Sequence, residues 1–459
     1  MAESRPRQPT TICWFRRDLR LDDHPALSAA NEAGRVLPVF VVDDALWGPA
    51  GDVRRAFLAG CLESLASATR GHLVIRAGDP VAEVPRLARE VEATAVYVSA
   101  DFGPYGRERD ERMARALGGL PDPVRLERVG SPYAVEPGTV VKEDGSPLRV
   151  FTPFSRRWRD HGWPVPTPRP PRMSWLSGVK GSGPPPAPEV RADLPTPGEA
   201  GARRRWEAFA AHGLDRYGDT RDQPGGDHTS RLSPYLKWGC IHPRTLLDGL
   251  GRGKGPDRFR SELCWREFYA DVLWHHPASA RHALQEPMAR MRLDRGAGAD
   301  ERFAAWAEGR TGYPIVDAGM RQLAAEAWVH NRVRMIVASF LVKDLHIDWL
   351  RGARYFMEHL VDGDLASNNH GWQWVAGTGT DAAPYFRVFN PVTQGRKFDP
   401  DGDYVRRWVP ELASLPARYV HCPWDADQLP IDAQGYPDRI VDHHAEREEA
   451  LARYQATRS

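Results

Sequence analysis

The chain has 459 residues, and its 62 Lys and Arg nearly balance its 61 Asp and Glu, which excludes a globally basic nucleic-acid binder; any such site must be local. The length suffices for two domains with ample cores. The N-terminus lacks an apolar signal segment and no run of 18 apolar residues occurs, so we expect neither secretion nor a membrane span. Five cysteines without a CxxC pair argue against a disulfide framework or a metal site and favour a reduced, cytoplasmic protein.

The first part of the chain alternates between strand and helix patterns. Short apolar runs predict strands at 11–15, 36–42, 73–75, 95–98 and 124–126, and helical spacing predicts helices at 53–68, 81–91 and 107–117. This βαβ alternation predicts a Rossmann-like α/β domain over residues 1–130, with a parallel sheet. No GxGxxG follows the first strand, so the usual dinucleotide fingerprint is absent.

The composition changes twice after this domain. Residues 161–200 contain eleven prolines, which predicts an interdomain linker, assigned to 131–200. From residue 201 onward the apolar spacing is helical, so we predict an all-α domain over 201–459 that ends in a charged helix at 440–458.

Two motifs early in this helical part combine polar and aromatic groups. Residues 229–233 read TSRLS before Pro234, where hydroxyls suit a helix N-terminus and could cradle a diphosphate; an ordinary N-cap is the alternative. Glu262 and Arg266 stand four apart, so we expect them to pair on a helix beside Trp265. An aromatic ring there could stack a nucleobase, worth roughly 1–3 kcal/mol. The alternative is a surface helix with one buried Trp.

Two later motifs extend this pattern. On a single helix through 328–335, Asn331 and Met335 would share a face with Trp328, and Arg334 could reach Asp362. A partly buried helix with solvated arginines is the alternative. The stretch 362–391 then brings two carboxylates, two amides and two indoles close together. An Asn carboxamide offers both a donor and an acceptor, which suits a flavin ring nitrogen, although a capped, Trp-rich helix end would look the same.

The order of these motifs is more specific than any one of them. TSRLS, ELCWREF, WVHNRVRM, DGDLASNNHGWQW and TDAAPYFRVFNP, with TICWFRRDLRLDDHPAL near the N-terminus and VFTPFSRRW near 150, closely resemble the DNA photolyase/cryptochrome family. The resemblance covers essentially the whole chain and is nearest to class I cyclobutane pyrimidine dimer photolyases. Animal-type cryptochromes and 6-4 photolyases usually carry His where this chain has Asn331 and Met335. A blue-light photoreceptor without repair activity is the alternative.

The resemblance implies a monomer that repairs UV-damaged DNA by electron transfer from excited, reduced FAD to a flipped-out dimer. The positions that match FAD contacts are Tyr217, Thr229, Ser230, Arg231, Leu232, Ser233, Glu262, Arg266, Trp328, Asn331, Arg334, Asp362, Asp364 and Asn368. The positions that match catalytic residues are Glu262, Asn368, Trp372 and Trp349. The positions that match dimer or DNA contacts are Arg221, Trp265, Asn331, Arg332, Met335, Trp374, Arg387, Arg396 and Lys397.

Two departures from the family pattern carry further expectations. Family members reduce FAD through three tryptophans, but the third falls here at Gly296, so the exit could run through Trp306 or another aromatic. Folate-antenna members carry Asn-Glu where this chain has Tyr105-Gly106. Together with Arg54 and Asp101, the sequence around Tyr105-Gly106 resembles that of members that hold an 8-hydroxy-deazaflavin antenna. The alternative is that both residues are solvated and no antenna binds.

Overall fold

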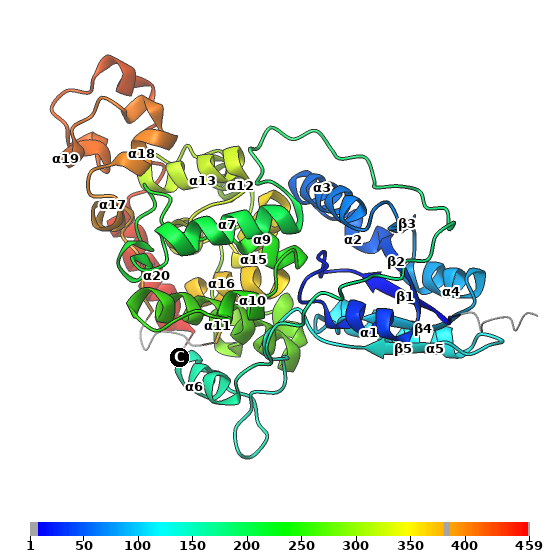
Figure 1. The fold of residues 1–459 in the computed structure, drawn as a ribbon. Coiled ribbons are helices and arrows are strands. Elements are labelled where there is room, and N and C mark those ends of the chain that lie inside the picture. The colour runs from blue at the N-terminus through cyan, green and yellow to red at the C-terminus, as the bar shows by residue number, and fades with distance from the viewer. Residues whose placement is uncertain (1–7, 381–385, 458–459) are drawn as a thin grey trace, which may run out of the picture.

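The computed structural model describes residues 8–380 and 386–457, and its N-terminal part is the predicted α/β domain (Figure 1). Five parallel strands lie in the order β3-β2-β1-β4-β5. They are β1 Thr10–Phe15, β2 Arg35–Val42, β3 Val74–Ala77, β4 Ala93–Val98 and β5 Arg125–Arg128. The accompanying helices are α1 Pro25–Ala33, α2 Asp44–Trp47, α3 Asp52–Ala68, α4 Pro80–Glu90 and α5 Pro104–Gly118. The fold class is confirmed; sequence reasoning missed α1 and α2.

The sheet has helices on both faces, as alternating side chains along β1 require. Ile12 and Trp14 belong to a core that includes residues of α4 and α5. Cys13 and Phe15 point the other way, into a core shared with α1 and α3. This second core continues into the helical part through Tyr235 and Phe268, so the α/β domain and the helices are packed against each other.

The proline-rich segment is better ordered than its composition predicts. The predicted linker 131–200 contains a helix, α6 Phe151–His161, and the extended, proline-rich part that comes after it follows the sheet. The Leu176 amide donates to the Val36 carbonyl at 2.8 Å, and the Ser182 amide donates to the Ile75 carbonyl at the same distance. The bond to Ile75 covers part of the edge strand β3, which would otherwise expose unpaired backbone groups, and the bond to Val36 lies at the start of β2, before its pairing with β3 begins at Val39. The predicted domain boundaries at 130 and 200 stay predictions.

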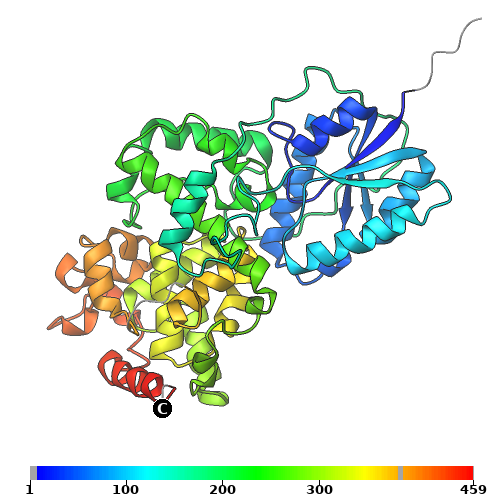
Figure 2. The same ribbon diagram turned by 90° about the horizontal axis from the view of Figure 1, so that it is seen from below.

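The rest of the chain is helical and forms a second lobe beside the sheet (Figure 2). Its helices are α7 Gly198–His212, α8 Tyr217–Thr220, α9 Ser233–Trp238, α10 Pro243–Leu247, α11 Lys254–His275, α12 Ala297–Ala307, α13 Pro314–Glu326, α14 Asn331–Ser339, α15 Trp349–His359, α16 Leu365–Ala376, α17 Pro391–Phe398, α18 Asp403–Trp408, α19 Ala417–Val420 and α20 His443–Ala456. Among the described residues, no helix is long and apolar enough to cross a membrane.

One expected helix is broken. α13 ends at Glu326, Ala327 adopts a left-handed conformation with φ 49°, and α14 begins only at Asn331. The His330 side chain accepts from the Arg332 amide and caps α14. The expectation that Trp328 shares a helix with Asn331 is therefore wrong, because Trp328 lies in the connection between the two helices.

Candidate functional site

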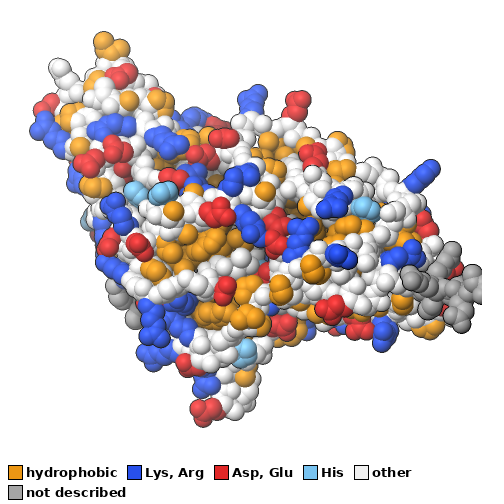
Figure 3. Space-filling model, in the orientation of Figure 1, with side chains coloured by type: hydrophobic (Ala, Val, Ile, Leu, Met, Phe, Trp, Pro, Cys, Tyr) orange, Lys and Arg blue, Asp and Glu red, His pale blue; other side chains and the backbone are white. Residues whose placement is uncertain are grey.

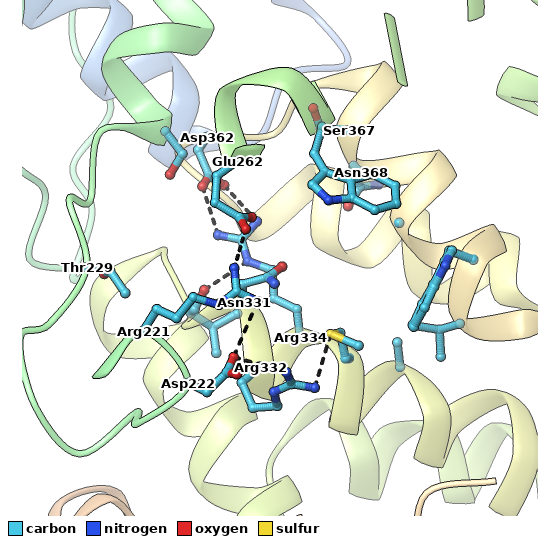
Figure 4. Close-up of a pocket in the computed structure, with 18 of the residues that line it drawn as sticks. Arg221, Asp222, Thr229, Glu262, Asn331, Arg332, Arg334, Asp362, Ser367 and Asn368 are labelled. Atoms are coloured by element: carbon cyan, nitrogen blue, oxygen red, sulfur yellow. Dashed lines mark hydrogen bonds and ion pairs between the residues drawn. The ribbon is translucent and has the colours of Figure 1, made fainter. Parts of the chain in front are cut away.

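A cavity of about 1170 Å³ opens in the helical lobe, where hydrophobic side chains meet charged ones on the surface (Figures 3 and 4). Its volume lies above the ~300–1,000 Å³ typical of small-molecule sites, so it has room for a large ligand and part of a second one. It is lined by every residue predicted to contact FAD, from Tyr217 to Asn368. Of the predicted dimer and DNA contacts, all but Arg396 line it.

The TSRLS segment enters the cavity without forming the predicted helix N-cap. α9 begins at Ser233 after Leu232, which offers no capping side chain, and the helix has only six residues. Arg205 instead fixes the segment by donating to the carbonyls of Thr229 and Ser230 at 2.7 and 2.8 Å. The Arg231 guanidinium lies 4.4 Å from the ring centre of Trp328. Hydroxyls and a cation thus line this end of the cavity, which suits an anionic group.

The predicted ion pair between Glu262 and Arg266 is wrong. Glu262 pairs with Arg221 from the neighbouring segment and lies 3.2 Å from Arg258 (Figure 4). Arg266 donates instead to the carbonyls of Pro132 and Leu236 at 3.1 and 3.2 Å. Burial explains the exchange, because carbonyls enclosed near α11 need a donor that solvent cannot supply. Arg221 and Arg258 therefore hold the Glu262 carboxylate at the cavity wall.

The predicted pair of Arg334 with Asp362 is present. The two guanidinium nitrogens of Arg334 donate to the two oxygens of Asp362 at 3.2 and 2.8 Å (Figure 4). A third donation, to the Val329 carbonyl at 2.8 Å, fixes the plane of the guanidinium. The bidentate geometry and the burial of Asp362, whose side chain is 2% exposed, orient a dipole along this wall.

Asp364 begins the helix that carries the central motif. Its side chain accepts from the Ser367 amide at 3.1 Å and caps α16. The same carboxylate accepts from Arg17, at the end of β1, at 2.5 Å. Burial acts to raise the pKa of Asp364, but Arg17, Lys237 and Arg266 outweigh it and hold the pKa well below its usual range. α16 is thereby fixed to the α/β domain by a carboxylate that stays ionised.

Asn368 lies one turn into α16. Its amide nitrogen donates to the Ala353 carbonyl at 3.0 Å and to the Asn369 side chain at 2.8 Å. Its carboxamide oxygen accepts no hydrogen bond from the residues that the structure describes, and it lies at the cavity. The nitrogen contacts fix the amide orientation, so the oxygen is left as a pre-oriented acceptor.

Trp372 and Trp374 stand two positions apart on α16 and therefore point in roughly opposite directions. Trp372 is buried and packs against Gly352, where even a Cβ would come within 2.3 Å of the indole. Trp374 is partly exposed. Both line the cavity, so the two indoles contribute to different walls.

The outer wall combines aromatic and basic groups. Trp265 is stacked on Phe151 with ring centres 3.7 Å apart, which holds its plane. Arg332 pairs with Asp222 at 3.0 Å, and Arg387 and Lys397 are exposed at the rim. Arg396 does not line the cavity; its guanidinium lies 2.9 Å from the Cys422 sulfur, so its place among the rim cations is not supported.

The ring contacts of Trp372 lead away from the predicted second tryptophan. Within the described part of the chain, its ring contacts are with Phe356 at 5.1 Å and Trp306 at 6.2 Å between ring centres. Trp306 in turn lies 5.4 Å from Tyr355, which is stacked on His359 at 4.0 Å. Trp349 is buried at the start of α15 and does not line the cavity. A connected set of rings thus leads from Trp372 to Trp306 and on to Tyr355 and His359, which is consistent with the expected exit through Trp306.

A second cavity, of about 250 Å³, lies where the α/β domain meets the helices, and we call it the interface cavity. Arg54 and Asp101 both line it. Asp101 is occupied by Arg109 at 3.1 Å and by the Gly103 amide at 3.2 Å. Four buried donors line this cavity without a partner among the described residues, and they are the indole nitrogens of Trp14 and Trp238 and the Nε atoms of Arg54 and Arg55. Such donors call for a ligand rich in acceptors.

Sequence reasoning missed several residues that line these cavities. Trp14, Trp238 and Tyr133 line the interface cavity, and Lys237 lines both. Lys237 follows SPYL directly, yet nothing in the helical spacing of that segment separates it from a solvated lysine. Only the packing of the two domains brings it between the cavities.

Comparisons with known proteins agree with this architecture. The FAD binding domain of DNA photolyase matches residues 259–456, and the DNA photolyase domain matches residues 11–172. A deoxyribodipyrimidine photo-lyase of Halobacterium salinarum is 40% identical over 97% of this chain and 99% of its own length. The chain therefore belongs to the DNA photolyase family.

Solved structures bear on the photolyase class to which the chain was expected to belong. A class III photolyase from Agrobacterium tumefaciens is 38% identical, covers the whole chain and 99% of its own, and superposes with a TM-score of 0.92. An archaeal photolyase from Sulfolobus tokodaii, described with two FAD molecules, is 30% identical over 97% of this chain and all of its own, with a TM-score of 0.82. The expected class I assignment is not supported, because a structure this similar belongs to class III.

Proposed function

We propose that this chain is a deoxyribodipyrimidine photolyase that repairs cyclobutane pyrimidine dimers in DNA in a light-driven reaction. The observation that carries the proposal is the free carboxamide oxygen of Asn368, a residue that lines the same cavity as the Arg334–Asp362 pair, in a cavity larger than one small ligand needs. The substrate class is supported by the relative named deoxyribodipyrimidine photo-lyase, which is 40% identical along almost the whole length of both chains.

The residues present fit FAD. Hydroxyls and a cation of the TSRLS segment stand at one end of the cavity, where the phosphates would lie, and α16 supplies the polar groups that a flavin ring needs. When bound and reduced, FAD supplies the light-excited electron that splits the dimer and that returns to the cofactor afterwards.

The protein's own groups would set the electrostatics of that site. The Asn368 oxygen can accept from a flavin ring N–H, which favours the state that carries that proton. The Arg334 guanidinium remains fixed to Asp362 and needs no reorganisation when negative charge develops nearby. Burial of Trp372 and the packed rings behind it exclude water from this wall.

The outer part of the cavity would receive the lesion. Trp265 and Trp374 offer apolar walls, and Glu262 supplies a carboxylate that can accept from a pyrimidine edge. Extruding the dimer costs a few kcal/mol of unstacking and unpairing, which is least at a damaged site. Arg221, Arg332, Arg387 and Lys397 would contact phosphates, which position the duplex without reading its sequence.

The deciding experiment is blue-light repair of an oligonucleotide that holds one thymine dimer, by FAD-loaded and chemically reduced protein. We expect dimers to disappear under light and to persist in the dark. Reduced, FAD-containing protein that binds this DNA but leaves the dimers intact under light would favour the photoreceptor alternative instead.

We infer further that the interface cavity holds the antenna, with 8-hydroxy-deazaflavin favoured over a folate. The four unpartnered donors suit its acceptors and its negative charge. Gly106 lies so close to Asp101 that a Cβ would come within 2.2 Å of the carboxyl carbon, so the folate members' Glu could not stand here without displacing Asp101. Adding the deazaflavin should produce a new blue absorption band and faster repair at that wavelength; an unchanged action spectrum would rule it out.

We infer, too, a monomer in a reducing cytoplasm. The five cysteines are all buried and none is in a disulfide, which suits a compartment that keeps thiols reduced. Light scattering after size-exclusion chromatography should give a mass near the 51.5 kDa of one chain.

A further inference from the structure

The two cavities share part of one wall. Lys237 and Asp364 line both of them, although Lys237 comes from α9 and Asp364 caps the N-terminus of α16. Arg17, which lines the interface cavity, holds Asp364 at 2.5 Å. A change of charge in this thin layer therefore acts on both cavities.

Asp364 and Arg17 neutralise each other, but Lys237 has no such partner. Its ammonium nitrogen lies 4.9 Å from the ring centre of Trp238, whose own indole nitrogen is one of the unpartnered donors. Among the described residues, it makes no ion pair within 4.0 Å. Lys237 is thus a half-buried amine that lines both cavities and has no ion-pair partner among the described residues.

The charged groups around Lys237 leave its ammonium form and its neutral amine form close in free energy near neutral pH. Burial, and then the positive charges of Arg17 and Arg54, lower its pKa, while Asp364 and Asp101 act in the opposite direction, and the net result is a pKa of about 7. Arg266 and Tyr133 lie beyond them, around Asp364. A negative charge added on either side would shift this balance toward the ammonium form.

We propose that Lys237 is a positioning residue through which an anion bound in the interface cavity influences the electrostatics of the large cavity. Binding of the anion makes Lys237 take up a proton from solvent and keep it. The resulting positive charge, at the shared wall, stabilises negative charge in the large cavity and so raises the reduction potential of a flavin held there. The inference rests on the proposed function, because it requires FAD in one cavity and an anionic ligand in the other.

The coupling is reciprocal by thermodynamic necessity. Reduction of the flavin should therefore tighten binding of the interface anion to the extent that Lys237 gains its proton. The size of this coupling depends on pH. Below the pKa of about 7, Lys237 is already protonated and the anion changes little; above it, the anion drives the uptake.

The first test measures protons. The FAD-loaded protein is titrated in weakly buffered solution with 8-hydroxy-deazaflavin, and with FMN as a second probe, and proton uptake is read with a pH indicator. We expect uptake of about one proton per bound probe at pH 8 and much less at pH 6. Lys237→Met should take up none, whereas the exposed Lys180→Met control should behave like the parent.

The second test measures the flavin. The FAD midpoint potential of the parent should rise when the probe binds at pH 8, and the Lys237→Met variant should show no rise. Lys237→Arg, which stays charged, should start at the raised value and change little. Probe binding without proton uptake, an undiminished potential rise in Lys237→Met, or failure of both probes to bind would overturn the inference. A parent that retains no FAD would instead overturn the proposed function.

Discussion

The two cavities differ in how their polar groups are satisfied before any ligand arrives. In the large cavity the main charges are already paired, as Arg334 is with Asp362 and Arg221 is with Glu262. In the interface cavity the indoles of Trp14 and Trp238 and the Nε of Arg54 have no partner among the described residues. The first site is pre-organised, while the second depends on its ligand to complete its hydrogen bonds.

This difference follows from where the walls come from. The large cavity is enclosed mainly by helices of one lobe, whose positions are fixed by their own core. The interface cavity lies between two lobes, so its donors reach an opening that neither lobe fills alone. Loss of one member of a charge pair should therefore affect stability and charge placement in the first site, whereas loss of an unpartnered donor should affect ligand affinity in the second.

The largest expected effect concerns electron entry into the large cavity. Trp372→Phe should abolish photoreduction of FAD by an external donor, because the cavity-lining indole that contacts Phe356 and Trp306 would be lost. Trp306→Phe should slow photoreduction more than Trp349→Phe does, which transient absorption can measure. Repair by chemically reduced protein should survive all three changes. A Trp349→Phe variant slower than Trp306→Phe would reject the Trp306 route.

Pre-organisation of the large cavity can be broken at its buried ion pair. Asp362→Ala leaves the Arg334 guanidinium without its carboxylate and should lower the free energy of unfolding by about 3 kcal/mol. Denaturant titration of the FAD-free protein measures this directly. The exposed Asp401→Ala serves as the control and should change stability by no more than ~0.5 kcal/mol. Equal effects of the two changes would show that the pair does not stabilise the fold.

The lesion-facing wall should respond through affinity. Trp374→Ala removes one aromatic face, and stacking worth roughly 1–3 kcal/mol predicts a loss of about 5- to 150-fold in binding to dimer-containing DNA. Trp374→Phe should recover most of this, and binding to undamaged DNA should barely change. Equilibrium fluorescence anisotropy with both DNAs separates these outcomes. An equal loss on undamaged DNA would place Trp374 outside the lesion site.

The interface cavity should lose its ligand without loss of FAD. Arg54→Ala removes one unpartnered donor and one positive charge, and a charge-assisted hydrogen bond of ~1.5 kcal/mol predicts about tenfold weaker binding of 8-hydroxy-deazaflavin. FAD content, read from absorbance, should stay at the parent level. Arg86→Ala, exposed on α4 and away from the cavity, is the matched control. Joint loss of both chromophores would mean that the two sites are not separate.

The smallest effect is expected at the rim. Lys397→Ala should reduce the slope of log affinity against log salt by about 0.9, the value for one lost phosphate contact, and weaken binding only a few-fold. Arg396→Ala should leave the slope unchanged, because that side chain lies against Cys422 rather than in the cavity wall. Titrations at several salt concentrations distinguish the two neighbours.

The sequence by itself determined the elements and the inventory of the site. Short apolar runs and helical spacing predicted the parallel sheet and its main helices to within a few residues, and the resemblance carried by the ordered motifs indicated a flavin site that includes Asn368. It also predicted the Arg334–Asp362 pair, which joins the first turn of α14 to the segment before α16. Residues 381–385 of the last motif lie outside the described residues.

Only the tertiary structure decided which charges pair and what stands between the cavities. Local spacing favoured Glu262 with Arg266, yet burial gave Arg266 two carbonyls and Glu262 a partner 41 positions away. Arg17 and Asp364 are 347 positions apart, and Lys237 acquires its place only when the two lobes close around it. Such pairings depend on desolvation, which rewards whichever donor reaches a buried acceptor, and sequence periodicity records only which face of an element is buried.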